Sequence, residues 1–135
     1  MICVVLDTNV FISGIFWERN YCSQIIELWK SGRISLITSR RLVEELVEIM
    51  QDFKIKLPAV IVHEWRNIIF DNSHTVVPTE EIDIVKEDSD DNILFETAIS
   101  GNAQYIVTQD KAVLKINNFR GIKFLNPEYF LRLFS

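Results

Sequence analysis

The chain has 135 residues, 48% of them hydrophobic, which suits a single domain with one substantial core that needs neither disulfides nor a structural metal. No run approaches the roughly 20 consecutive apolar residues of a membrane span, and Asp7 interrupts the apolar start too early for a signal peptide, so we expect a cytoplasmic protein with no membrane partner. The net charge of −5 excludes nucleic-acid binding through bulk positive charge alone, although metal ions held by carboxylates would reduce the negative charge facing a phosphate backbone.

Strands and helices are predicted to alternate along one domain spanning residues 1–135. Apolar β-rich runs predict strands at residues 2–6, 34–38, 74–77, 104–108 and 122–125, the last of them at a sheet edge. Helical periodicity predicts helices at residues 10–17, 21–32, 40–53, 58–70, 92–102 and 127–134. Gly32 is the expected stop of the second helix, and Thr38 or Ser39 the expected cap of the third. This alternation indicates a three-layer α/β/α fold with a mostly parallel central sheet.

Two of the predicted strands are followed by an aspartate. Asp7 ends the run CVVLD, and Asp110 follows Thr108 at the end of YIVTQD. In open parallel sheets functional groups gather beyond the carboxyl ends of the strands, so the two side chains are expected at the same sheet edge. The alternative for either aspartate alone is a helix cap or a turn.

The predicted helix after Ser39 carries three glutamates with different expected environments. An advance of about 100° per residue places Glu44 and Glu48 opposite the apolar stripe, where water solvates them. Glu45 flanks that stripe and can face a cleft, although an exposed helix glutamate is the simpler alternative.

The run EDSDDN begins the predicted helix at residue 92, and its acids have two interpretations. Acidic residues often cap a helix start and offset its dipole, which accounts for Asp88 or Asp90. Asp91 shares the buried face with Leu94 and Ala98, and no Lys or Arg stands at matching spacing on this helix. A bound cation is therefore its expected partner, with Asp88 and Asp90 as supporting or replacement candidates.

Carboxylates gathered at one site repel one another unless a divalent cation compensates their charge. A cluster of Asp7, Glu45, Asp91 and Asp110 therefore predicts a metal, and all-oxygen ligands favour Mg²⁺ or Mn²⁺ over Zn²⁺. No second His or Cys stands near a histidine at zinc-binding spacing. Such ions activate water and neutralise charge during phosphodiester cleavage, so a nuclease is the simplest function.

The sequence resembles the PIN domain almost end to end, especially the VapC-like subgroup of toxin components of toxin-antitoxin systems. The segments that carry the resemblance are VLDTNVFIS, ITSRRLVEELVEIM, DSDDNILFETAISGNAQYIVTQDKAVL and GIKFLNPEYFL. The resemblance implies a metal-dependent ribonuclease, blocked by a small antitoxin protein and assembled as a homodimer. It assigns catalysis and metal binding to the same four acids, with Asn9 and Thr108 in support. Gln109 departs from the family, which usually has glycine there, and Ser89 also departs from the usual small residue or proline.

Three basic residues near the predicted site are candidates for RNA phosphate contacts, namely Arg40, Arg41 and Lys111. Solvated surface charge is the alternative for each. Two other functions stay open: a catalytically silent PIN-fold module that binds RNA or protein, and a phosphoacceptor domain of the response-regulator type. The phosphoacceptor class needs paired acids after the first strand and an Asp ending a central one, whereas VVLDTN supplies one acid and ISLITS ends in a hydroxyl residue.

Overall fold

The computed structural model describes residues 1–52, 57–82 and 89–134, excluding the side chains at positions 89–91. Within these residues one sheet has the strand order β3-β2-β1-β4-β6-β5. All neighbouring strands are parallel except the antiparallel pair β5 and β6. The strands are β1 (Ile2–Leu6), β2 (Ile34–Ser39), β3 (His74–Val76), β4 (Tyr105–Val107), β5 (Asn118–Phe119) and β6 (Ile122–Leu125).

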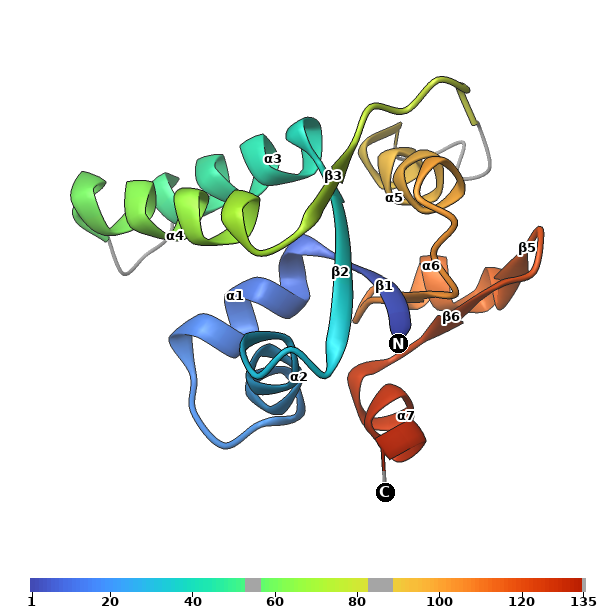
Figure 1. The fold of residues 1–135 in the computed structure, drawn as a ribbon, viewed down its shortest axis with the longest axis horizontal. Coiled ribbons are helices and arrows are strands. Elements are labelled where there is room, and N and C mark those ends of the chain that lie inside the picture. The colour runs from blue at the N-terminus through green and yellow to red at the C-terminus, as the bar shows by residue number, and fades with distance from the viewer. Residues whose placement is uncertain (53–56, 83–88, 135) are drawn as a thin grey trace.

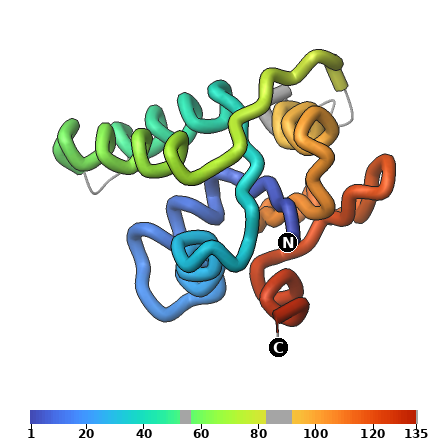
Figure 2. Tube along the Cα trace, in the orientation of Figure 1, coloured from blue at the N-terminus to red at the C-terminus, as the bar shows by residue number. Residues whose placement is uncertain are grey.

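Helices cover both faces of this sheet (Figure 1). They are α1 (Thr8–Phe16), α2 (Tyr21–Lys30), α3 (Arg40–Asp52), α4 (Ala59–Asp71), α5 (Ser89–Ser100), α6 (Lys111–Ile116) and α7 (Pro127–Leu131), followed by the 3₁₀ turn η1 (Arg132–Phe134). In Figure 2 the tube shows α3 and α4 lying side by side on the same side of the sheet as α1 and α2. The predicted three-layer architecture is confirmed.

Alternation along the central strands creates two cores. Val4 and Leu6 of β1 pack with the buried residues of α1, α2, α3, α4 and α7 on one face. Val5 points the opposite way and packs with the buried residues of α5, α6 and β6. A strand covered on both faces is apolar throughout, which explains why ICVVL shows no polar alternation.

The second helix begins and ends at residues that satisfy its free backbone groups. Asn20 accepts a hydrogen bond from the Ser23 amide while the Ser23 hydroxyl accepts one from the Asn20 amide, which forms a capping box. At the other end Gly32, with φ of 76°, donates to the Trp29 carbonyl, and Arg33 donates to the Leu28 carbonyl. This is a Schellman motif, and the predicted stop at Gly32 is confirmed.

The prediction that residues 122–125 form an edge strand is wrong. β6 lies between β4 and β5, and β5 takes the edge. The two strands are joined by Arg120 and Gly121, whose φ values of 50° and 84° match the two-residue hairpin turn with positive φ at both central positions. Neither β5 nor the short helix α6 was predicted from the sequence, because both are too short to show periodicity.

The chain reverses direction across the sheet between β1 and β4. From β1 it proceeds to β2 and β3 on one side, then returns to β4 and β6 on the other. Ligands of open α/β sheets bind at such a switch point, beyond the carboxyl ends of the strands. Leu6 pairs in register with Val107, so the next residues, Asp7 and Thr108, meet there.

The described part of the chain contains no helix that is long and apolar enough to cross a membrane. Cys3 is half-buried and Cys22 is buried, and both are free thiols.

Candidate active site

Asp7 is the buried carboxylate at the centre of the site, with 7% of its surface exposed. Its Oδ1 accepts hydrogen bonds from the Thr8 amide at 2.7 Å and the Thr8 hydroxyl at 3.3 Å. Its Oδ2 accepts from the Thr108 hydroxyl at 2.7 Å and the Asn9 side-chain amide at 3.3 Å. All four donors are neutral groups, so Asp7 is held in one orientation without a basic partner among them.

The Thr108 hydroxyl connects Asp7 to Asp110. This fully buried oxygen donates to Asp7 and accepts a hydrogen bond from the Asp110 backbone amide at 3.0 Å. The predicted meeting of the two strand-end acids is confirmed in this form, through a threonine that the resemblance had already marked as supporting. Asp110 is less buried than Asp7, and its Oδ1 accepts from the Ala112 amide at 2.8 Å.

Hydrogen bonds of Gln109 connect the loop that carries Asp110 to α1. Its backbone amide donates to Asn9 Oδ1 at 3.2 Å, and its side-chain amide donates to the Asn9 carbonyl and the Ser13 hydroxyl, each at 3.0 Å. Asn9, a predicted supporting residue, therefore contacts Asp7, Thr108 and Gln109. The sequence marked Gln109 only as a departure from the family pattern and gave no signal for Ser13.

Burial raises the pKa of Asp7 above its ordinary value of 3.8. The hydrogen bonds from Thr108 and Thr8 oppose this effect because they stabilise the charged form, while the negative charge of Asp110 adds to it. No basic side chain among the described residues contributes to the pKa of Asp7. Asp110 is therefore close enough to Asp7 to interact with it electrostatically.

Both aspartates also cap helices. Asp7 is the N-cap of α1 and Asp110 the N-cap of α6. The capping alternative weighed for each residue is correct, and it does not exclude a site. Each cap bond uses Oδ1, which leaves Asp7 Oδ2 facing Thr108 and Asp110 Oδ2 without a hydrogen bond from any described residue.

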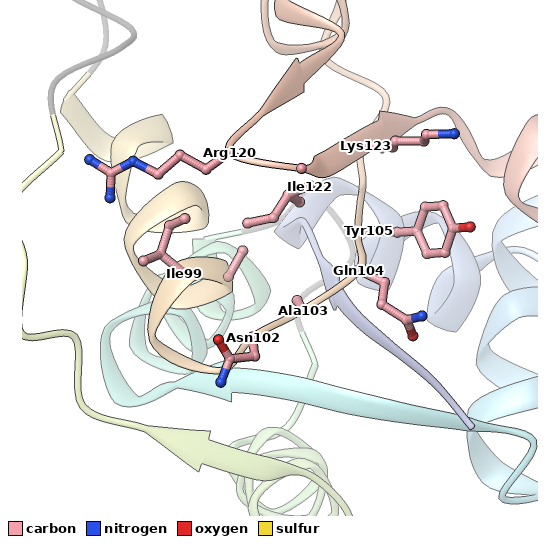
Figure 3. A pocket seen from close by; sticks show the side chains of 10 residues that line it. Ile99, Asn102, Ala103, Gln104, Tyr105, Arg120, Ile122 and Lys123 are labelled. Atoms are coloured by element: carbon pink, nitrogen blue, oxygen red, sulfur yellow. The ribbon is translucent and has the colours of Figure 1, made fainter.

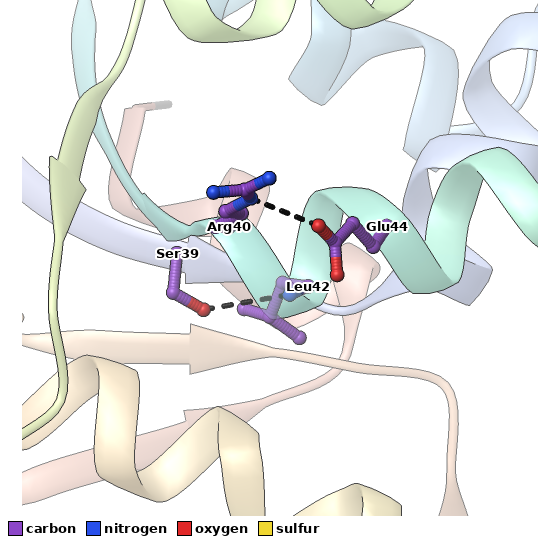
Figure 4. Close-up of polar contacts among 4 residues, drawn as sticks. All are labelled: Ser39, Arg40, Leu42 and Glu44. Carbon is purple, nitrogen blue, oxygen red and sulfur yellow. Dashed lines mark hydrogen bonds and ion pairs between the residues drawn. The ribbon is translucent and has the colours of Figure 1, made fainter.

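The start of α3 has the predicted distribution of glutamates. Glu44 and Glu48 are exposed, and Glu45 is half-buried. Figure 4 shows Glu44 paired with Arg40 on the surface, at 2.9 Å, and the Ser39 hydroxyl accepting from the Leu42 amide at 3.5 Å. Ser39 thus serves as the predicted cap, and its hydroxyl also accepts a 2.9 Å hydrogen bond from buried Thr97 of α5.

Comparison with known proteins identifies the family. Residues 3–112 match the family model of the PIN domain. The chain belongs to the PIN domain family. The predicted resemblance is confirmed by this match, which covers both aspartates of the site. A comparison with curated protein sequences finds no match.

Solved structures of PIN proteins share the fold. VapBC2 from Rickettsia felis, bound to a DNA fragment from its promoter, is 16% identical with a TM-score of 0.63, covering 93% of this chain and 98% of that one. VapBC-1 from nontypeable Haemophilus influenzae is 15% identical with a TM-score of 0.64, covering 94% and 99%. FitAB bound to the IR36 DNA fragment is 15% identical with a TM-score of 0.57, covering 92% and 94%. At these identities the likeness establishes the fold.

The remaining acids of this PIN domain bear on its metal-binding capacity. Asp88 and the side chains of Asp90 and Asp91 lie outside the described residues, so their assignment stays a prediction. Among the side chains that the structure does describe, no three His, Cys, Asp or Glu come together as a metal site. Asp7 and Asp110 therefore form a pair there, and Glu45 as a third ligand is likewise still a prediction.

The basic candidates differ in their surroundings. Arg40 and Arg41 are exposed at the start of α3, and Arg40 forms an ion pair with Glu44. Lys111 directly follows Asp110, is exposed, and forms no ion pair with any residue in the described ranges. Lys111 is thus the cation nearest in sequence to the acid pair.

A separate pocket of about 440 Å³ lies at the opposite end of the strands, lined by residues 98–99, 102–105 and 120–123 (Figure 3). Figure 3 shows its two cations, Arg120 and Lys123, pointing in different directions, and Arg120 pairs with Glu80 at 2.8 Å. The pocket lies at the amino ends of β4 and β6, whereas ligands of open α/β sheets bind beyond the carboxyl ends. It is therefore not part of the carboxylate site.

Proposed function

We propose that this PIN domain is a divalent-metal-dependent endoribonuclease and the toxin of a toxin-antitoxin pair. The observation that carries the proposal is the Asp7–Thr108–Asp110 connection at the switch point of the sheet. The Thr108 hydroxyl donates to the carboxylate of Asp7 and accepts from the backbone amide of Asp110, and both aspartates follow the ends of adjacent strands. Asp7 is buried, with no basic side chain among the groups that affect its pKa. Such an arrangement suits a bound cation better than a purely structural role.

The donor set fits Mg²⁺ or Mn²⁺. Asp7 and Asp110 offer carboxylate oxygens, and the structure describes no His or Cys grouped with them. Asp7 and Asp110 would hold the metal, with Asp91 and Glu45 as the proposed further ligands. When bound, the metal would activate water and neutralise the charge that develops on the cleaved phosphate.

The residues around the acids have distinct tasks in this proposal. Thr108 and Thr8 favour the charged form of Asp7, which burial disfavours, because their hydrogen bonds stabilise the carboxylate. Asn9 and Gln109 lock the two loops together and so keep Asp110 at a fixed separation from Asp7. Preorganised carboxylates need not rearrange during the reaction.

The same comparison supports an antitoxin as a partner. The structures that share the fold are VapBC2 and FitAB, each bound to a DNA fragment, and VapBC-1, and we propose a small antitoxin protein that covers the carboxylate edge here. RNA is the proposed substrate. We also propose a homodimer, because Val60 and Ile68 of α4 and Ile49 of α3 are exposed apolar side chains.

The test is cleavage of a mixed RNA pool with Mn²⁺ or Mg²⁺, repeated with chelator to reveal contaminating nucleases. Asp7→Asn and Asp110→Asn keep a cap-forming oxygen but lose the charge, so each should lower metal-dependent cleavage by at least ~100-fold without unfolding the domain. Full activity of Asp7→Asn would refute the ribonuclease. RNA binding by the wild type without any cleavage would instead favour the silent module.

A further inference from the structure

A second hollow, with a volume of about 390 Å³, is lined by the residues on either side of Asp110 in the sequence. Gln109 and Lys111, the neighbours of Asp110 on either side, line it, and so does Tyr21 at the start of α2. We call this hollow the Tyr21 pocket. Its lining residues are Ser13, Asn20, Tyr21, Cys22, Gln109, Lys111, Leu114, Asn126, Pro127 and Glu128.

The lining of the pocket combines an exposed aromatic ring with apolar side chains. Tyr21 is 50% exposed, and its ring stacks on no other aromatic ring within the described residues. Burial raises the pKa of Cys22 to about 11, so its thiol is neutral at physiological pH. Leu114 and Pro127 complete the apolar part of the lining. A flat, uncharged ring would fit this environment.

Gln109, Asn126 and Lys111 each add one polar side-chain atom that forms no hydrogen bond or ion pair with another described residue. The side-chain amide nitrogen of Gln109 is bonded to Asn9 and Ser13, which leaves its Oε1 available as an acceptor. The Asn126 oxygen accepts from the Tyr129 amide, which leaves its Nδ2 available as a donor. Lys111 brings a positive charge next to Asp110 in the sequence, whereas Glu128 of α7 forms an ion pair with Arg132 of η1 at 3.4 Å.

We propose that the Tyr21 pocket binds one nucleotide of single-stranded RNA beside the phosphate that is cleaved, with its base on Tyr21. This inference rests on the proposed ribonuclease function and names the recognition element next to its site. Single-stranded RNA is recognised through unstacked bases that lie on aromatic rings and hydrogen-bond through their edges. The ring, the free acceptor and the free donor supply those contacts, and Lys111 meets the phosphate on the side of the acids. The volume is within the usual range for small-ligand pockets.

Binding can be measured apart from cleavage. The probes are fluorophore-labelled poly(U) and poly(A) strands, each about ten nucleotides long, and the duplex of the two, titrated in chelator so that no metal-dependent cleavage occurs. Tyr21→Ala should weaken single-strand binding by about 10-fold, and Tyr21→Phe, which keeps the ring, by less than about two-fold. The matched control is Tyr129→Ala, because Tyr129 is 51% exposed and does not line the pocket.

Lysine variants supply an independent measurement. Lys111→Ala should reduce the slope of log affinity against log salt by about 0.7, the value for one phosphate contact on a single strand. Lys115→Ala, an exposed lysine of the same helix outside the pocket, should leave the slope unchanged. The duplex should bind the wild type more weakly than either single strand, because its bases are already stacked.

The outcomes separate this inference from the proposed function. Equal binding by Tyr21→Ala and Tyr129→Ala, or equal salt slopes for Lys111→Ala and Lys115→Ala, would overturn the pocket even if the wild type cleaves RNA. Absence of any single-strand binding would overturn it as well. Binding that depends on Tyr21 and Lys111 in a protein that cleaves nothing would support the pocket while the ribonuclease fails.

Discussion

Replacing Thr108 by valine tests the hydroxyl connection at the centre of the site. Valine keeps the shape of threonine and removes every hydrogen bond of the fully buried hydroxyl, including a long one of 3.5 Å from the Asn9 side-chain amide. Asp7 then loses its 2.7 Å donor, and the Asp110 amide loses its 3.0 Å acceptor. A hydrogen bond to a charged group contributes about 1.5–3 kcal/mol and a neutral one about 0.5–1.5 kcal/mol. We therefore expect Thr108→Val to lower the free energy of unfolding by about 2–4 kcal/mol at neutral pH, a fall of roughly 10 °C in Tm.

The destabilisation by Thr108→Val should depend on pH, and the direction of this dependence follows from the pKa of Asp7. Burial already raises that pKa above 3.8, and the Thr108 hydrogen bond opposes the rise. Without the hydroxyl the folded-state pKa rises further. A carboxyl whose folded-state pKa exceeds its unfolded value favours folding most below the unfolded pKa and loses that contribution as pH rises through the folded one. The destabilisation by Thr108→Val should thus be smallest near pH 4 and complete above the folded-state pKa.

The assay is urea unfolding in chelator at about pH 4 and about pH 8, for the wild type, Thr108→Val, Thr108→Ser and each change in an Asp7→Asn background. Thr108→Ser keeps the hydroxyl and should cost about 1 kcal/mol at both pH values, because it loses only a buried methyl group. In the Asp7→Asn background the cost of Thr108→Val should fall toward the value of a neutral hydrogen bond. An equal cost of Thr108→Val at both pH values and in both backgrounds would refute a bond to ionised Asp7.

Three further outcomes are expected. Glu45→Gln should reduce RNA cleavage by at least ~100-fold, whereas Glu44→Gln, which removes only the surface pair with Arg40, should leave it nearly unchanged, and equal activities would exclude the role of Glu45. Millimolar Mn²⁺ or Mg²⁺ should raise the Tm because it binds only the native state, and Asp7→Asn should lose most of that gain; an unchanged Tm in the wild type would count against a preformed site. Sedimentation should show a homodimer, and a monomer at tens of micromolar would remove that proposal.

The fold could be predicted because its long elements have clear patterns. The run at residues 2–6 is apolar on both faces, and α3 shows an apolar stripe, so both were predicted with the correct type. β5 has two residues, and it pairs with β6 only because Arg120 and Gly121 turn the chain back. Such a strand depends on tertiary contacts and leaves no periodic signal, which is why β6 was wrongly expected at the edge.

The site was predictable where strand topology decides position. Asp7 and Thr108 follow paired residues of adjacent parallel strands, so the sequence positions of two strand ends sufficed to bring them together. The contacts of Gln109 with Asn9 and Ser13 join segments about a hundred residues apart through an adaptable amide. Neither spacing nor periodicity encodes such a contact, and the same holds for the lining of the Tyr21 pocket.

The capping and functional interpretations of Asp7 have one physical origin. A parallel strand that leads directly into a helix places its next residue both at the N-cap and at the sheet edge where ligands bind. The two carboxylate oxygens then have different partners. Oδ1 accepts from the Thr8 amide at the helix start, and Oδ2 accepts from the Thr108 hydroxyl at the sheet edge. Asp7→Asn keeps an acceptor for the cap and removes the charge, whereas Asp7→Ala also removes the cap, at a further cost of about 1 kcal/mol. A loss of cleavage in the asparagine variant with an unchanged or higher Tm therefore assigns the effect to the charge and not to the helix.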